Sequence, residues 1–197
     1  MGFFDISGDT VKAAEAAASF NLSIPPTAKT AKDGSAAFTE HVRVKDASSE
    51  TVEKDIEGTK TEVLVLHLNM ECDKLGSGLN EGKTFKTNLR INKQALAKGG
   101  SHAKGTPWKK QHVMSQLSIS KLKQIVRGCG FQPDGEDGGF SQTFLAECFP
   151  PVDNFSGEAS PLIGQAFWAE VKSRLSEGND GKMYTNYDIN NVLEDNG

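Results

Sequence analysis

The alternation of apolar and polar side chains between Thr61 and Cys72 restricts the fold of this chain more than any other feature. Every second residue from Leu64 to Cys72 is apolar, so the pattern persists over five periods. Successive side chains of a strand point to opposite faces, and a period of two therefore indicates a strand with one face in the core. We predict such a strand here, and with it a mainly β protein.

The same alternation predicts four further strands. Two of them are Phe38 to Lys45 and Lys83 to Ile91. The other two, Ala166 to Arg174 and Lys182 to Val192, are expected to pair as a hairpin, because an Asp-Gly pair between them favours a tight turn. Five antiparallel strands are therefore expected.

One helix is expected between the third and fourth of these strands. Ser118 is placed to cap its N-terminus, and apolar residues then recur at helical spacing to about Arg127. The preceding segment, Lys98 to His112, contains several glycines and a proline, so we predict a long loop there. A short apolar run at Thr143 to Phe149 follows the helix.

The length of 197 residues favours one domain with tails. Residues 1–34 offer little to bury and are expected to form a flexible arm, residues 35–193 the folded domain, and residues 194–197 a short tail. No apolar run is long enough to cross a bilayer, so we expect no membrane association. The three cysteines are far apart, which indicates neither a disulfide framework nor a zinc site, and a reducing cytoplasm fits.

Charge is distributed very unevenly along the chain. The formal net charge is only -4, yet the segment from Gly82 to Pro133 contains eleven of the 22 Lys and Arg residues and none of the 26 Asp and Glu residues. A basic segment in an otherwise acidic protein favours contact with a polyanion. The alternative is a solvated lysine-rich face, although such faces normally mix both signs.

Bases and aromatic rings together are typical of proteins that hold single strands, since cations follow the phosphates and rings stack on unpaired bases. Trp108 lies among lysines in the predicted loop, where we expect it to stack on a base, whereas Trp168 either shares that role or packs in a second layer. The predicted DNA-binding residues are Lys83, Lys86, Arg90, Lys93, Lys98, Lys104, Trp108, Lys109, Lys110, Trp168, Lys172, Arg174 and Tyr184.

Enzymatic chemistry has no evident site in the sequence. The segment Ser77 to Thr84 differs by one residue from a phosphate-binding loop, but such a loop requires a following helix and the next residues alternate as a strand. The four histidines lack the spacing of metal ligands, and no nucleophile motif is present. We therefore expect no catalysis, no cofactor and no metal, with an NTP-dependent enzyme as a minor alternative.

The predicted order of five strands and a helix can be laid on the OB-fold, a five-stranded antiparallel barrel. Beyond that, the chain resembles the single-stranded DNA-binding proteins of tailed bacteriophages over Glu62 to Leu193. The similarity lies in Leu117 to Ile125 and in Leu162 to Val171 leading to Tyr184-Thr185-Asn186.

This resemblance implies a non-enzymatic protein that coats exposed single-stranded DNA during phage replication, recombination or repair, in the cytoplasm of an infected bacterium. It also implies self-association along the strand and an acidic C-terminal tail that recruits replication enzymes. The end of this chain departs from that pattern, since residues 190–197 contain two acids and no terminal aromatic residue. The competing hypothesis is a structural or scaffolding phage protein whose basic segment contacts DNA.

Overall fold

The computed structural model describes residues 29–30, 36–76, 80–97, 103–135, 139–152, 159–177 and 183–193. Its strands are β1 (Lys29–Thr30), β2 (Ala36–Ile56), β3 (Thr59–Cys72), β4 (Thr84–Asn92), β5 (Ala166–Glu177) and β6 (Met183–Leu193). Its helices are α2 (Lys93–Ala97), α3 (Pro107–Gly128) and α4 (Gln142–Cys148). The predicted mainly β class is confirmed.

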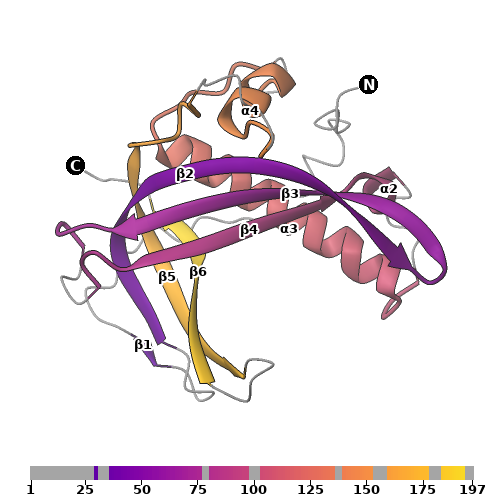
Figure 1. The fold of residues 1–197 in the computed structure, drawn as a ribbon, viewed down its shortest axis with the longest axis horizontal. Helices are drawn as coiled ribbons and strands as arrows, with labels where there is room; N and C mark the ends of the chain where they lie inside the picture. The colour runs from indigo at the N-terminus through magenta and orange to yellow at the C-terminus, as the bar shows by residue number, and fades with distance from the viewer. Residues whose placement is uncertain are drawn as a thin grey trace.

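One antiparallel sheet contains the five long strands in the order β4-β3-β2-β5-β6, and the short β1 pairs with β2. Figure 1 shows β2, β3 and β4 as a curved layer with α3 behind it. The sheet is not closed, because no backbone ladder joins its two edge strands, β4 and β6. Side chains connect these edges instead: the Thr87 hydroxyl donates to an Asp188 carboxylate oxygen at 2.9 Å, and the rings of Phe85 and Tyr187 lie 6.4 Å apart.

Strand β2 is much longer than the strand predicted at Phe38 to Lys45. It continues to Ile56 and forms a hairpin with β3 through Glu57 and Gly58, which have φ values of 54° and 77°. A β-bulge lies between Val44 and Asp46, and such an extra residue exchanges the inward and outward positions of the strand. The predicted end was therefore wrong, because the alternation breaks at the bulge.

Strand β4 follows its predicted pattern closely. Phe85, Thr87, Leu89 and Ile91 are buried, while the residues between them are exposed. The buried face packs in the main core with apolar side chains of β3, β5, β6 and α3. The hairpin predicted from Ala166 onward is also confirmed as β5 and β6, which pair antiparallel with an irregularity between Glu170 and Val171.

Helix α3 begins eleven residues before its predicted cap. Thr106 is the N-cap and accepts from the Lys109 N–H at 3.2 Å, with Pro107 at the first helical position, where proline fits well. Ser118 instead lies inside the helix, and its hydroxyl accepts from the Arg90 N–H of β4 at 3.1 Å. Ser115 accepts in the same way from the Asn92 N–H at 2.9 Å, so α3 covers this part of the β4 edge.

The apolar run at Thr143 to Phe149 forms α4, capped by Ser141, which accepts from the Phe144 N–H at 3.2 Å. Within the described ranges, no helix is long and apolar enough to span a bilayer.

Candidate nucleic-acid interface

The side chains of β2, β3 and β4 that point away from the core form one surface, called here the outer sheet face. On β4 it presents Thr84, Lys86, Asn88 and Arg90, all exposed. Strand register places Lys86 opposite Asn69 and Asn88 opposite His67. The predicted basic strand face therefore exists, beside two polar positions of β3.

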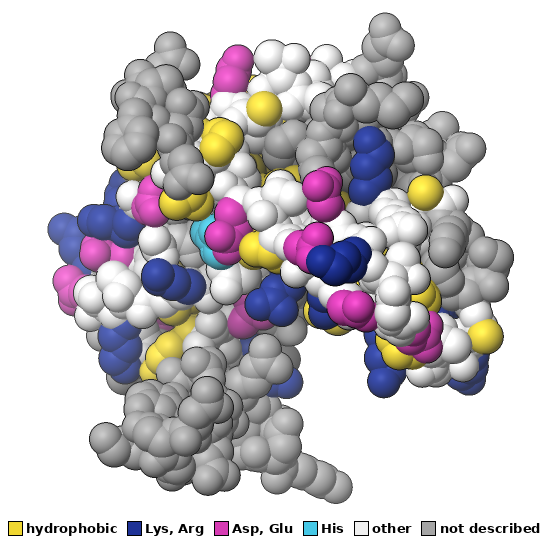
Figure 2. Space-filling model, turned by 45° about the vertical axis from the view of Figure 1, so that its right-hand side comes forward, with side chains coloured by type: hydrophobic (Ala, Val, Ile, Leu, Met, Phe, Trp, Pro, Cys, Tyr) yellow, Lys and Arg dark blue, Asp and Glu magenta, His cyan; other side chains and the backbone are white. Residues whose placement is uncertain are grey.

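Acidic residues of β2 and β3 interrupt this surface. Glu50 accepts from the ring of His67 at 3.0 Å, Asp46 accepts from the amide of Asn69 at 3.2 Å, and Glu71 lies 3.6 Å from the ammonium of Lys45. Figure 2 accordingly shows both signs of charge interspersed over the face in view. A segment that is free of acids in the sequence is thus not free of acidic neighbours in space, which weakens its local field.

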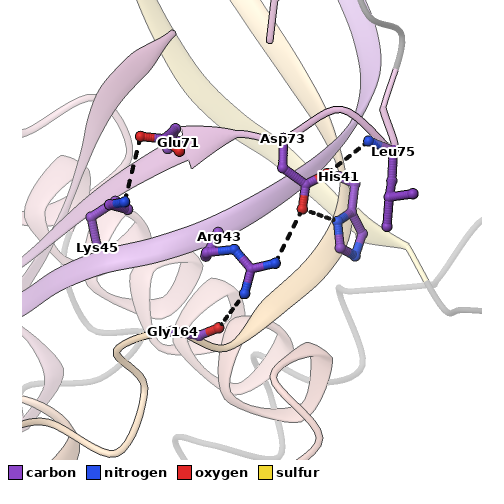
Figure 3. Close-up of polar contacts among 7 residues, drawn as sticks. All are labelled: His41, Arg43, Lys45, Glu71, Asp73, Leu75 and Gly164. Atoms are coloured by element: carbon purple, nitrogen blue, oxygen red, sulfur yellow. Dashed lines mark hydrogen bonds and ion pairs between the residues drawn. The ribbon is translucent and has the colours of Figure 1, made fainter. Parts of the chain in front are cut away.

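At the end of the outer sheet face, the Asp73 carboxylate contacts the imidazole of His41 and the guanidinium of Arg43, as Figure 3 shows. An Asp73 oxygen lies 2.6 Å from His41 Nδ1 and 3.5 Å from an Arg43 nitrogen, and the other oxygen accepts from the Leu75 N–H at 2.9 Å. Arg43 also donates to the Gly164 carbonyl at 2.7 Å. These contacts tie β2 to the turn after β3 and to the segment that leads into β5.

The pKa of Asp73 reflects this arrangement. Partial burial acts to raise it, but the hydrogen bonds from Leu75 and His41 and the charges of His41 and Arg43 outweigh that effect and lower the pKa below its ordinary value. Asp73 is therefore a carboxylate at neutral pH, and it holds one face of Arg43 toward the protein.

Trp168 lies beside this group, on the outward face of β5 as predicted. Its ring meets that of His41 edge-on, with centroids 5.1 Å apart and an interplanar angle of 61°. The indole is half-buried, so it retains exposed ring area while being held in position. His41 and Trp168 are directly opposite each other in the β2–β5 ladder.

Trp108 does not occupy the predicted exposed loop. It lies in the first turn of α3, is only 8 % exposed, and packs in a small cluster with Ile56 and Ala95. The loop prediction was wrong from Pro107 onward, because the proline that indicated a loop is the first residue of a helix. A ring packed in this way has no face available for stacking on a base.

The remaining predicted positions are dispersed over the fold. Lys83 donates to the Asn80 side chain at 2.9 Å, and Asn80 donates to the buried Glu40 at 2.6 Å, so this lysine helps to close a turn. Lys172 is half-buried on β5. Lys93 begins α2, and Lys104 is exposed just before α3. Lys109 and Lys110 lie in the first turn of α3. Arg174 and Tyr184 lie on strands, but their side chains are outside the described set, and Lys98 lies outside the described residues.

Three residues of the outer sheet face were missed in the sequence: His41, Arg43 and His67. Each alternates with a core residue of its strand, as between Val42 and Val44, so the alternation itself indicated that they face outward. They lie outside the acid-free segment, which begins after β3, so the charge pattern of the sequence did not indicate them.

The enzyme alternative concerns metal ligands, thiols and the segment after Lys83. No group of three or more His, Cys, Asp or Glu side chains there is placed to hold a metal. Burial raises the pKa of Cys72, Cys129 and Cys148 to about 12, so these thiols remain protonated and unreactive at neutral pH. The residues after Lys83 form a strand rather than the helix that a phosphate-binding loop requires.

Comparison with protein-family models finds no match, and no curated protein or solved structure is similar to the chain at a significant level. The case for a function therefore depends on the site itself.

Proposed function

We propose that this protein is a non-enzymatic, largely sequence-independent single-stranded DNA-binding protein, which coats exposed strands during phage DNA replication, recombination or repair. The observation that carries the proposal is the outward row of β4: four consecutive outward positions are exposed, two carry positive charge and two can form hydrogen bonds. Such a row follows a phosphate backbone without reading bases.

The strand order supports an OB-like reading of the fold. With β2 to β6 taken as the five strands, β4-β3-β2-β5-β6 is the order of an OB barrel opened between its third and fifth strands. Thr87 and Asp188 bridge that same seam. OB barrels are often partly open, and they bind oligonucleotides on the face of their second and third strands. Those strands would be β3 and β4, which form the outer sheet face together with β2.

Trp168 and His41 supply the flat rings that the proposal requires. A base stacked on the exposed part of Trp168 would contribute about 1 to 3 kcal/mol. Arg43, whose side chain is 44 % exposed although it contacts Asp73, is placed to meet the adjacent phosphate. The proposed site is therefore Lys86, Asn88 and Arg90 of β4 with Arg43 and Trp168 at its other end, and Trp108 is not part of it.

The electrostatic contribution is expected to be moderate. If Arg43, Lys86 and Arg90 each neutralise one phosphate, log K should fall against log salt with a slope of about -2, from about -0.7 per phosphate. The carboxylates of Asp46, Glu50 and Glu71 keep the slope from being steeper.

Fluorescence titration with oligo-dT tests the proposal. Trp168 is the half-buried indole and should be quenched, so Trp168→Phe should abolish the fluorescence signal. The affinity of this variant is measured by the anisotropy of fluorescein-labelled oligo-dT and should be weaker than that of the parent, by up to about tenfold. Lys86→Gln combined with Arg90→Gln should weaken binding at least tenfold and flatten the salt slope. The matched control is Lys123→Gln with Arg127→Gln, which removes the same charge from α3 and should change affinity less than threefold.

Equal losses in the two double variants would contradict the proposed site, because net charge alone would then explain binding.

The alternative is a structural or scaffolding phage protein. It is favoured by the five Lys and Arg residues of α3, since none of the described aromatic side chains of that helix is exposed for stacking on a base. That protein would bind duplex DNA as well as single strands, whereas stacking on Trp168 requires unpaired bases. Competition between the two forms of DNA separates the hypotheses.

A further inference from the structure

The solvent-facing side of α3 carries an apolar stripe that the proposed DNA interface does not use. Val113, Met114 and Leu117 are 40 %, 44 % and 60 % exposed, and they make up half of the large apolar side chains exposed in the described ranges. Their spacing of i, i+1 and i+4 places them on one side of the helix. The core-facing residues of α3, such as Ile119 and Leu122, lie on the other side.

The charged residues of α3 itself all have one sign. α3 has 22 residues, which include Lys109, Lys110, Lys121, Lys123 and Arg127 and no Asp or Glu. Lys110 lies one turn before the stripe and Lys121 one turn after it, although Lys121 also contacts Asp188 at 3.7 Å. Apolar side chains with cations at each end favour a ligand that combines apolar and acidic groups.

The helix is rigidly placed before any partner arrives. Its N-terminus is capped by Thr106, and the hydroxyls of Ser115 and Ser118 are bonded to the edge of β4. Ser115 lies between Met114 and Leu117 in the sequence and Ser118 directly follows Leu117, so the backbone that carries the stripe is fixed. Binding on a preformed surface costs little conformational entropy.

We propose that this stripe is the docking site for an acidic, amphipathic segment of a partner protein. Its apolar side chains would cover Val113, Met114 and Leu117, and its carboxylates would meet Lys109, Lys110 and Lys121. An α3–α3 contact between two copies of the chain is a poor alternative, since two acid-free helices repel each other. A nucleic acid is also a poor occupant, because phosphates would desolvate against the three apolar side chains.

The test uses a fluorescein-labelled synthetic peptide of about four helical turns, with leucines along one side and glutamates elsewhere. Fluorescence anisotropy with the full-length protein should give a micromolar Kd. Met114→Gln with Leu117→Gln should weaken binding at least tenfold, and Lys109→Gln with Lys110→Gln about fivefold. Both changes are at exposed or half-buried positions of α3, and circular dichroism checks that the fold is kept.

The matched control is Leu75→Gln with Val152→Gln, which removes two apolar side chains outside α3 that are 59 % and 60 % exposed. It should bind the peptide as the parent does, and a peptide of the same composition in shuffled order should bind at least tenfold more weakly. Affinity for oligo-dT, measured by Trp168 quenching, should be unchanged in the Met114 and Leu117 double variant, which keeps this test separate from that of DNA binding.

Four outcomes would overturn the proposal. One is no binding of the peptide at millimolar concentration, and another is equal binding of the shuffled peptide. A third is loss of oligo-dT affinity in the Met114 and Leu117 double variant, which would make the stripe part of a DNA site. The last is a dimer in the parent that this variant abolishes, since a second copy would then be the occupant.

Discussion

The variant Trp108→Ala distinguishes between the buried Trp108 of the structure and the exposed stacking platform that the sequence predicted. An exposed stacking platform would leave stability unchanged and weaken DNA binding. The buried indole, only 8 % exposed against Ile56 and Ala95, predicts the opposite. Trp108→Ala should destabilise the fold and leave the DNA affinity of the folded protein unchanged within about twofold.

The size of the effect follows from the area that the ring buries. A buried aromatic side chain removes roughly 150 to 250 Å² from water, which at about 25 cal/mol per Å² corresponds to about 4 to 6 kcal/mol. Compactness of the unfolded chain reduces such values by roughly 10 to 40 %. We therefore expect the free energy of unfolding to fall by about 3 kcal/mol, near the lower end for Trp→Ala in cores.

Urea denaturation followed by circular dichroism measures this change. With a slope of about 2 kcal/mol per molar urea, the midpoint should move down by about 1.5 M while the slope stays constant. Trp168→Ala is the comparison variant, because that indole is only partly buried and its loss should therefore cost less than that of Trp108. A loss below about 0.5 kcal/mol in Trp108→Ala, together with weaker DNA binding, would refute the burial argument.

Two further predictions concern the interior of the fold. The pKa of Asp73 is lowered in the folded state, so its contribution to stability is complete above the unfolded pKa of about 3.9 and is lost as pH falls through the folded value. Asp73→Asn should therefore lower the free energy of unfolding at pH 7 and reduce the dependence of stability on pH in the acid range. An unchanged dependence would contradict this. Gly128→Ala should destabilise the protein by about 1 to 2 kcal/mol, although alanine has the better helix propensity. The added Cβ would lie 2.7 Å from a Val192 methyl and 3.2 Å from Phe167 Cβ. A higher midpoint in thermal unfolding would contradict this, because it would show that these neighbours move aside at no cost.

Much of the sheet could be predicted from the sequence because burial imposes a period of two. β4 is the clearest case, since Phe85 to Ile91 alternate and each apolar position is buried. The hairpin of β5 and β6 was predicted for the same reason. The extension of β2 beyond Lys45 was not, because a bulge shifts the phase of alternation and the residues after it are mainly polar.

Helix α3 shows a different kind of failure. Thr106-Pro107 is a favourable helix start, but the glycines before it and the lysines after it are typical of a loop, and a loop was predicted. Trp108 was then judged exposed because its neighbours in sequence are charged. Its actual neighbours, Ile56 and Ala95, come from β2 and α2, and local composition does not report such contacts.

The prediction of the candidate site was limited in the same way, because local composition does not report neighbours from other strands. The acid-free segment predicted a uniform basic surface, yet strand pairing places Glu71 of β3 opposite Thr84 of β4. Asp46 and Glu50 lie one strand further, on β2, where they are hydrogen-bonded to Asn69 and His67 of β3. Pairing partners are set by register across the sheet, which a count of charges along one segment does not contain.

The seam between β4 and β6 has a dynamic consequence. Along it, the edges are held by the Thr87–Asp188 hydrogen bond, the contact of Phe85 with Tyr187 and the Lys121 ammonium, which donates to the Ile189 carbonyl. Parting the β5–β6 hairpin from β4 breaks no backbone ladder, so this opening costs less than global unfolding. Amide hydrogens that face the seam, on Lys86 and Asn88, should therefore exchange with solvent sooner than those of Arg90 and Asn92, which α3 covers.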